Sequence, residues 1–174
     1  MNPARRIAST LCAGTLAVLF APPAQAGEWV IQGQVVGVAD GDTVTVLDKN
    51  KQQHRVRVAG IDAPEKGQPF GNASKDNLAR MIFKRRVEVR CYKEDRYGEV
   101  CRVYNDKLRD VGLAQVSAGF AWWYREYSHE QTTQERGAYS AEEANAKAAK
   151  RGLWKDPNPV PPWEWRRGKR APSG

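Results

Sequence analysis

Three acidic residues and one arginine, in two short runs of this 174-residue chain, have the types and spacing to do chemistry. Asp42 lies in the run DGDT at 40–43, and Arg57, Asp62 and Glu65 lie in the run RVAGIDAPE at 57–65. Two carboxylates from different turns can hold a hard divalent cation, and a third can activate a water molecule. An arginine can clamp a phosphate through paired N–H groups. This arrangement predicts the hydrolysis of phosphodiesters.

Each of these residues, taken singly, also has an ordinary structural explanation. Asp-Gly is a favoured hairpin sequence, so Asp42 could simply form a turn. The Asp-Ala-Pro sequence at 62–64 could mark the exit of a strand. Glu65 could be a solvated loop acid, and Arg57 could lie on a solvated strand face. The functional interpretation therefore depends on the order and spacing of the four residues.

Residues 1–26 have the pattern of a cleaved signal peptide. Arg5 and Arg6 form a positive start, an apolar stretch follows at 11–20, and Ala-Gln-Ala at 24–26 offers a cleavage site before Gly27. The apolar stretch is short for a membrane-spanning helix, so a retained anchor is the weaker alternative. We therefore expect an exported protein, periplasmic or secreted, with no stable membrane anchor once the leader is removed.

Export bears on the cysteines and on the charge. Cys91 and Cys101 remain in the mature chain, where an oxidising compartment would allow a disulfide between them; two buried thiols on neighbouring strands are the alternative. The net charge is +8, and loss of the leader with Arg5 and Arg6 leaves 26 basic against 20 acidic residues, or +6. A basic domain suits a polyanion such as nucleic acid, although many exported proteins are basic.

The first half of the mature chain predicts five strands and one helix. Apolar and β-branched residues alternate along the strand segments, Asp40–Gly41 marks a hairpin turn, and a second turn follows at 48–51. A helical spacing of apolar residues separates the third strand from the fourth. Five strands with a helix in that position predict an α+β fold, an OB-fold-type β-barrel with about three α-helices. The strands are expected at 29–38, 43–47, 54–61, 87–91 and 100–104, and the helix at 70–85.

The second half predicts two more helices and an irregular tail. A short helix is expected at 110–118, then an extended aromatic stretch at 120–127. A final helix should run to Arg151 and is clearest from Ser140, where Ser140 and Glu143 match a capping box; Gly137 suggests a break before it. The domain would span 27–154. The Pro-, Trp- and Arg-rich segment 155–174 is expected to be an extended C-terminal tail without regular structure.

The ordered set of motifs resembles the thermonuclease (staphylococcal-nuclease-like) family. The matching runs are DGDTV at 40–44, Arg57 five residues before Asp62, DAPE at 62–65 and DRYG at 95–98. Order and spacing agree over about residues 29–154, and PPWEW at 161–165 is similar to the tails of exported bacterial members. The resemblance implies an OB-fold barrel that binds calcium and hydrolyses DNA and RNA to products ending in 3′-phosphate.

The resemblance also implies a role for each site residue. Asp42 and Asp62 would bind Ca²⁺ through their carboxylates, and Ala63 through its main-chain carbonyl, since a hard cation prefers oxygen ligands. Glu65 would be the general base or would orient the attacking water. Arg57 would bind the phosphate and stabilise the charge that builds in the transition state.

One position departs from the family pattern. The second catalytic arginine should follow the Tyr97–Gly98 pair, and Glu99 stands there instead. Arg102 would point to the opposite strand face, so Arg96 in the preceding loop is the better substitute. Glu99 could instead pair with Arg57 and occupy both side chains. The sequence thus predicts a nuclease with an intact metal site and a weakened departure of the leaving group.

Aromatic and basic residues could add substrate contacts. Tyr97 and Tyr124 are expected to bind substrate, and Trp122, Trp123 and Arg125 lie beside Tyr124, a mixture typical of grooves for single-stranded nucleic acid. Packing of the tryptophans between barrel and helices is the alternative. The basic tail could bind phosphates or could simply be solvated.

The sequence therefore predicts a monomeric, calcium-dependent nuclease that acts on DNA and RNA and favours single strands. His54, expected on an exposed strand face, has no part in this mechanism. The leading alternative is a non-catalytic nucleic-acid-binding OB-fold module, which Glu99 favours and the retained acids oppose. A basic exported adhesin is a third possibility, but it leaves the four site residues without a role.

Overall fold

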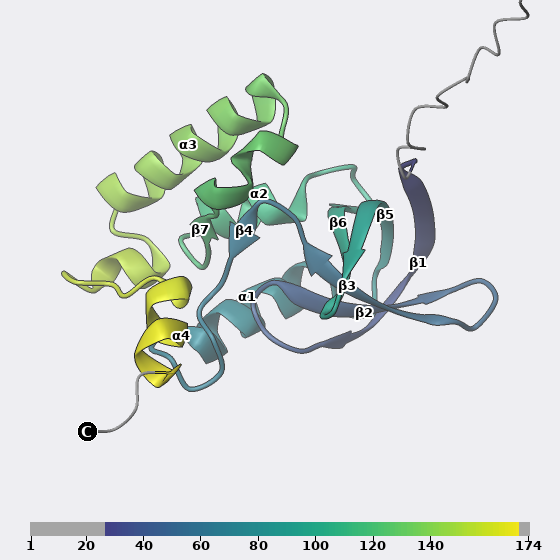
Figure 1. Ribbon diagram of the computed structural model, residues 1–174, viewed down its shortest axis with the longest axis horizontal. Helices are drawn as coiled ribbons and strands as arrows, with labels where there is room; N and C mark the ends of the chain where they lie inside the picture. The colour runs from purple at the N-terminus through teal and green to yellow at the C-terminus, as the bar shows by residue number, and fades with distance from the viewer. Residues whose placement is uncertain (1–26, 171–174) are drawn as a thin grey trace, which may run out of the picture.

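Five strands close into a barrel in a computed structural model of the chain that describes residues 27–170 (Figure 1). The predicted signal peptide at 1–26 lies outside the described residues. Around the barrel the strands follow the order β1-β2-β3-β6-β5, so the predicted α+β barrel is confirmed. The barrel strands are β1 (Trp29–Val38), β2 (Thr43–Asp48), β3 (Gln53–Val58), β5 (Arg86–Asp95) and β6 (Gly98–Asn105).

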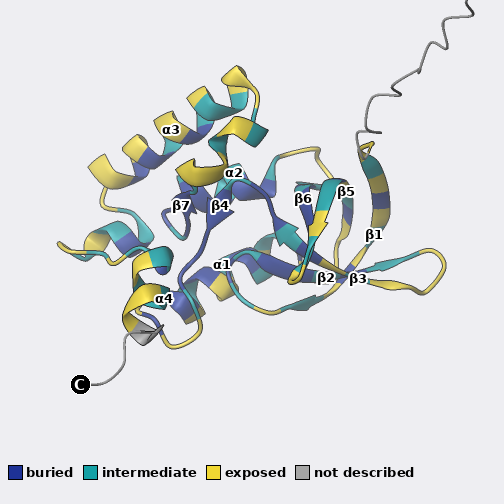
Figure 2. Cartoon of the chain, in the orientation of Figure 1, coloured by how far each residue is buried: buried dark blue, intermediate teal, exposed yellow. Residues whose placement is uncertain are grey.

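Alternation along these strands supplies the barrel core. Valines at every second position of the strands point inward, where β-branched side chains pack well on a pleated surface. The helix α1 (Gly71–Ile82) adds Leu78 and Ile82, both fully buried, to the same hydrophobic core. Burial is continuous from the barrel into the helices (Figure 2). The fully buried valines of the strands are Val35, Val44, Val46, Val56, Val89 and Val103.

The third strand is shorter than expected because the chain leaves the barrel at Gly60. Gly60 has a φ of +77°, a conformation that favours glycine, and the predicted strand at 54–61 ends at Val58. The next two residues form β4 (Ile61–Asp62), which pairs antiparallel with β7 (Trp122–Trp123) in a separate two-stranded sheet. This sheet carries Asp62 out of the barrel toward the helices.

The helix α3 (Thr133–Ala148) begins earlier than predicted. Thr132 is its N-cap: the Thr132 side chain accepts from the Glu135 amide at 3.2 Å, and the Glu135 carboxylate accepts from the Thr132 amide at 2.6 Å. The capping box expected at Ser140 was therefore wrong, and Gly137 lies inside a continuous helix. The predicted helix at 110–118 is α2 (Val111–Ser117), capped by Asp110.

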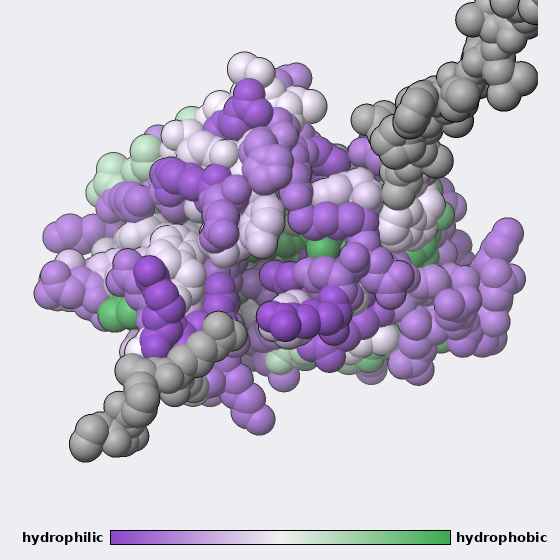
Figure 3. Space-filling view, viewed as in Figure 1, coloured by the Kyte–Doolittle hydropathy of each residue, from purple (hydrophilic) through white to green (hydrophobic). Residues whose placement is uncertain are grey.

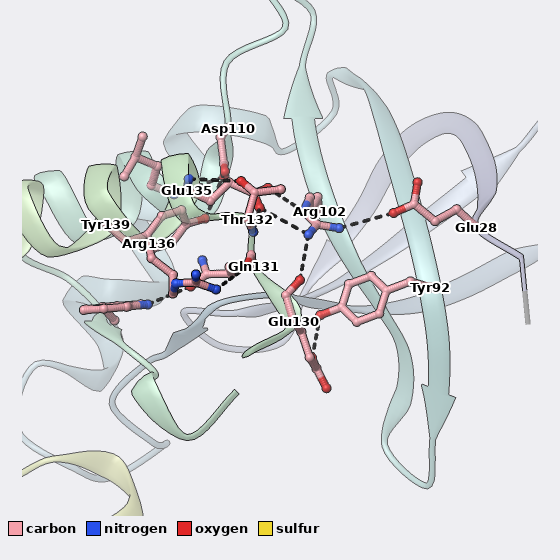
Figure 4. Close-up of polar contacts among 12 residues, drawn as sticks. Glu28, Tyr92, Arg102, Asp110, Glu130, Gln131, Thr132, Glu135, Arg136 and Tyr139 are labelled. Atoms are coloured by element: carbon pink, nitrogen blue, oxygen red, sulfur yellow. Dashed lines mark hydrogen bonds and ion pairs between the residues drawn. The ribbon is translucent and has the colours of Figure 1, made fainter. Parts of the chain in front are cut away.

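A polar network joins the barrel to α3 (Figure 4). Arg102 of β6 donates to the Glu135 carboxylate at 2.6 Å and to the Glu130 carbonyl at 2.9 Å. Glu130 ends the 3-10 segment η1 (Arg125–Glu130), and its carboxylate accepts from the Tyr92 hydroxyl at 2.9 Å. Arg102 thus points toward α3 and does not line the cavity. The sequence predicted that it lies on the strand face opposite to that of position 99.

Two further features complete the architecture. The cysteines face each other across β5 and β6, where Cys91 pairs with Cys101 in the strand register and the two sulfur atoms form a disulfide.

Within residues 27–170, no helix combines the length and the apolar character needed to cross a bilayer.

The described part of the C-terminal segment, residues 155–170, contains a helix, so the prediction of an extended tail without regular structure was wrong there. A 3-10 turn, η2 (Gly152–Lys155), follows α3, and the helix α4 (Pro162–Arg170) packs back against the domain (Figure 1), where Trp163 contacts Trp122 and Tyr124. Proline is favoured at the first position of a helix because its missing N–H needs no partner there. The Pro161 carbonyl accepts from the amides of Glu164 and Trp165, both at 3.0 Å.

Candidate active site

Asp42 sits at the turn between β1 and β2, packed against the segment that follows β4. Its Oδ2 accepts from the Ala63 amide at 2.8 Å, and its Oδ1 accepts from the Thr43 hydroxyl at 3.0 Å. The preceding Gly41 permits this packing, because a Cβ there would lie only 1.8 Å from Ser74 Oγ. The Asp-Gly pair therefore serves both the turn and the approach of Asp42 to Ala63.

Asp62 and Glu65 lie on the segment that leaves the barrel. The Asp62 side chain is only 6% exposed, whereas that of Glu65 is 36% exposed. Gln68 shapes the loop between β4 and α1, because its side-chain oxygen accepts from the Glu65 amide at 3.0 Å. The chain thus buries one carboxylate and leaves the other open to solvent.

Asp42 and Asp62 are electrostatically crowded. Burial, followed by the charges of Asp40 and Asp62, raises the pKa of Asp42 well above its ordinary value. Burial also raises the pKa of Asp62, although hydrogen bonds from Arg166 oppose this shift and the charge of Glu65 adds to it. Carboxylates in such surroundings favour a nearby cation, because a cation stabilises their ionised form.

Arg57 extends from β3 toward the same region. It donates from Nη1 to Asp95 Oδ2 at 2.7 Å, and its guanidinium lies 5.5 Å from the centre of the Tyr97 ring. Asp95 also accepts from the Tyr97 amide at 2.7 Å, which fixes the turn between β5 and β6. The possible pairing of Arg57 with Glu99 was therefore wrong, because Asp95 is the partner.

One cavity of about 440 Å³ brings these residues together. It is open to solvent and receives side chains from the β1–β2 turn, β3, the segment after β4, the β5–β6 turn, η1 and α4. The lining residues include the predicted Asp42, Arg57, Asp62, Ala63, Glu65, Tyr97 and Tyr124, together with Asp95, Tyr127 and Arg166.

Arg166 was not among the predicted site residues, but its guanidinium pairs with two of the acids, Asp62 and Glu65. Its Nη1 donates to Asp62 Oδ1 at 3.0 Å and to Glu65 Oε1 at 2.7 Å, and its Nη2 donates to Asp62 Oδ2 at 2.7 Å. A signal was present, because Pro162 followed by Glu164 in the first turn is typical of a helix start. Recognising that helix would not have revealed where it docks.

Glu99 does not line the cavity. Its carboxylate lies 2.9 Å from Nδ1 of His54, and the His54 side chain is 11% exposed rather than exposed as predicted. Burial lowers the pKa of His54, but hydrogen bonds and charge from Glu99 and Asp48 outweigh it and raise the pKa. The Glu99 carboxylate therefore faces His54 and not the cavity.

The other predicted contact residues separate into two groups. Trp122 and Trp123 are 5% and 9% exposed, so the packing alternative holds for both. Tyr124 lines the cavity and stacks on Trp163 of α4, with ring centres 5.6 Å apart and planes 20° apart. Arg96 is exposed beside the Tyr97 ring, 4.8 Å from its centre, and the structure does not bring it into the cavity.

Several known proteins match most of this chain, and a family model matches part of it. Residues 55–156 match the staphylococcal nuclease homologue family. A micrococcal nuclease of Shigella flexneri is 38% identical over 148 residues, which cover 80% of this chain and 82% of that protein. An uncharacterized endonuclease of Haemophilus influenzae is 39% identical over 134 residues, covering 77% and 72%. Protein ParB of Escherichia coli is 41% identical over 173 residues, covering 94% and 93%.

Proposed function

The chain belongs to the staphylococcal nuclease homologue family and is an endonuclease of the hydrolase class. We propose that it is an exported, calcium-dependent nuclease that cleaves both DNA and RNA. The observation that supports this proposal is the single cavity lined by Asp42, Asp62, Glu65 and Arg57. These are the residue types that phosphodiester hydrolysis requires: oxygen ligands, a base and a guanidinium.

The donor set near Asp42 fits a hard divalent cation. Asp42 and Asp62 offer carboxylate oxygens and Ala63 offers a carbonyl, with no nitrogen or sulfur ligand among them, and calcium prefers this set. A cationic guanidinium already binds both oxygens of Asp62, which shows that a positive charge is accommodated there. Within the described residues, Cys91, Glu99 and Cys101 form a tighter cluster, but a disulfide joins the cysteines. When bound, the ion would polarise the phosphate.

Glu65 and Arg57 would act directly in the hydrolysis of the phosphodiester. Glu65 is exposed enough to meet solvent, so its carboxylate can accept a proton from the water that attacks phosphorus. Arg57 lines the same cavity and would exchange its ion pair with Asp95 for a phosphate oxygen, where it stabilises the developing charge. We expect products that end in 3′-phosphate.

The shape and the polarity of this surface support a single-stranded substrate. The cavity is open and polar, and the face in Figure 3 is mostly hydrophilic with small, separate hydrophobic patches. Tyr97 is 48% exposed and Tyr124 is half-buried beside the acids, so both can stack on unpaired bases. A single strand can present its bases to them, which is why single-stranded substrates should be favoured. We expect a monomer to be sufficient, because one chain supplies every residue of the cavity.

Cleavage assays with purified mature protein test this function. Single-stranded DNA, RNA and duplex DNA are incubated with Ca²⁺, with Mg²⁺ or with a chelator, and product ends are identified by mass spectrometry. We expect Ca²⁺-dependent cleavage that Asp62→Asn abolishes and that Asp106→Asn, an exposed acid outside the cavity, leaves unchanged. Oligonucleotide binding without cleavage at any Ca²⁺ concentration would instead indicate a binding module. Export is tested by the N-terminus of the secreted protein, which should be Gly27.

A further inference from the structure

The C-terminal helix delivers a second guanidinium to the active-site cavity. Arg166 of α4 makes three hydrogen bonds, two to Asp62 and one to Glu65, through its Nη1 and Nη2 atoms. A guanidinium has five N–H donors in a planar fork. Its Nε–H and one Nη2–H make no hydrogen bond to the residues that the structure describes, and they are available to a ligand.

Aromatic packing holds α4 in this position. Trp163 stacks on Tyr124 and meets the edge of Trp122, with ring centres 5.6 Å and 6.4 Å apart. Just before the helix, the Val160 carbonyl accepts from the Gln68 side chain at 2.7 Å, and Gln68 also binds the Glu65 amide. The loop that carries Glu65 and the helix that carries Arg166 therefore share one hydrogen-bonded anchor, which fixes them relative to each other.

The barrel arginines do not supply a second partly buried guanidinium to the cavity. Arg57 is the barrel arginine that is partly buried at the cavity, and Arg55, which also lines the cavity, is exposed. Arg102 is bound to Glu135 on the side of α3, and Arg96 lies outside the cavity. Position 99 contributes a carboxylate that faces His54. A transferring phosphate, which carries charge on several oxygens, is best stabilised by donors from more than one direction.

We propose that Arg166 is a catalytic residue, the second phosphate-binding arginine of this nuclease, supplied by the C-terminal helix instead of by strand β6. This inference rests on the proposed function. A cation bound between Asp42 and Asp62 would compete with Arg166 for the Asp62 oxygens, and the released N–H groups would then face a phosphate bound in the same cavity. Arg166 would remain tethered by Trp163 and by its bond to Glu65.

The same contacts allow the opposite interpretation, in which Arg166 inhibits the enzyme. The direction in which Arg166→Gln changes turnover decides between the two interpretations. If Arg166 only blocked Asp62 and Glu65, removing it would raise both calcium affinity and turnover. If Arg166 binds the phosphate, removing it raises calcium affinity, because a competitor for Asp62 is lost, but lowers turnover and substrate affinity.

The experiment compares Arg166→Gln, Arg166→Lys and the matched control Arg167→Gln, which removes the same charge from an exposed neighbour on α4. At saturating Ca²⁺, Arg166→Gln should lower kcat on single-stranded DNA by about 100-fold, the usual effect of losing one transition-state donor. Arg166→Lys should recover part of the rate, since lysine keeps the charge and loses the planar fork. Arg167→Gln should stay within about threefold of wild type.

Two binding measurements complete the test. In a Glu65→Gln background, which slows cleavage during the binding measurement, adding Arg166→Gln should weaken binding of a fluorescent thymidine decamer by about tenfold in Ca²⁺. Calorimetry should show tighter Ca²⁺ binding for Arg166→Gln, and circular dichroism should show an unchanged fold. Wild-type turnover in Arg166→Gln, or a gain, would overturn the inference while leaving the proposed function standing. An inactive wild type would instead overturn the proposed function.

Discussion

Glu143 joins α3 to the strand that supports the active site, and its removal should destabilise the protein measurably. The side chain is 1% exposed, and Oε1 accepts from the Trp123 amide at 3.1 Å. Oε2 accepts from Arg125 at 2.7 Å and from Lys147 at 2.9 Å. Because β7 pairs with β4, these bonds also support Asp62.

The magnitude of the effect follows from what each partner loses in Glu143→Ala. The buried Trp123 amide is left without an acceptor, which costs about 1–3 kcal/mol. Arg125 and Lys147 are 54% and 45% exposed, so water rehydrates them and each lost pair costs at most about 1 kcal/mol. We therefore expect a loss of about 2–4 kcal/mol in the free energy of unfolding. For a domain of this size, the Tm should fall by about 6–12 °C.

Urea unfolding followed by tryptophan fluorescence measures this loss. The control is Glu143→Gln, which keeps an oxygen acceptor for the Trp123 amide and should cost only about 1 kcal/mol. Burial raises the pKa of Glu143, but hydrogen bonds and charge from Arg125 and Lys147 outweigh it, so the pKa lies below its ordinary value. The stabilisation is therefore complete above about pH 4.5 and is lost as the pH falls through the folded-state pKa. An alanine variant within about 0.5 kcal/mol of wild type at neutral pH would refute the reasoning.

Two further predictions concern the barrel. The raised pKa of His54 means that its pairing with Glu99 stabilises the protein fully below about pH 6.5 and loses this effect as the pH rises through the folded-state pKa. Glu99→Gln should therefore destabilise more at about pH 6 than at about pH 9, and an equal loss at both would contradict the pairing. Replacing Cys91 and Cys101 by alanine should cost about 2–3 kcal/mol in urea unfolding. An unfolding midpoint unchanged by the double substitution would contradict a stabilising disulfide.

The barrel and most of the residues that line the cavity were predictable because their signals are local. Alternating β-branched residues specify the strands, and the spacing between Arg57 and Asp62 follows from one strand and its exit. The start of α3 was missed for a different reason. Ser140 and Glu143 matched a capping box by type, but Glu143 is held by Trp123, and Thr132 with Glu135 caps the helix eight residues earlier.

The contribution of the C-terminus could not be predicted because it depends on packing between segments far apart in the sequence. Taken alone, a Pro- and Arg-rich stretch resembles a solvated arm, because its own sequence does not show the aromatic surface on which it packs. That surface, formed by Trp122 and Tyr124, exists only after β7 has paired with β4. The partner of Glu99 was missed similarly, since strand position alone does not reveal that His54 lies beside it.

The most direct test of the catalytic mechanism compares wild type with Glu65→Gln in the Ca²⁺-dependent cleavage of single-stranded DNA, with Ca²⁺ affinity measured on the same samples. If Glu65 activates water while Asp42 and Asp62 hold the ion, the variant should lose about 100-fold or more in kcat. Its Ca²⁺ affinity should stay within about threefold of wild type, because Glu65 is not assigned as a ligand. Cleavage by Glu65→Gln at the wild-type rate would contradict the mechanism.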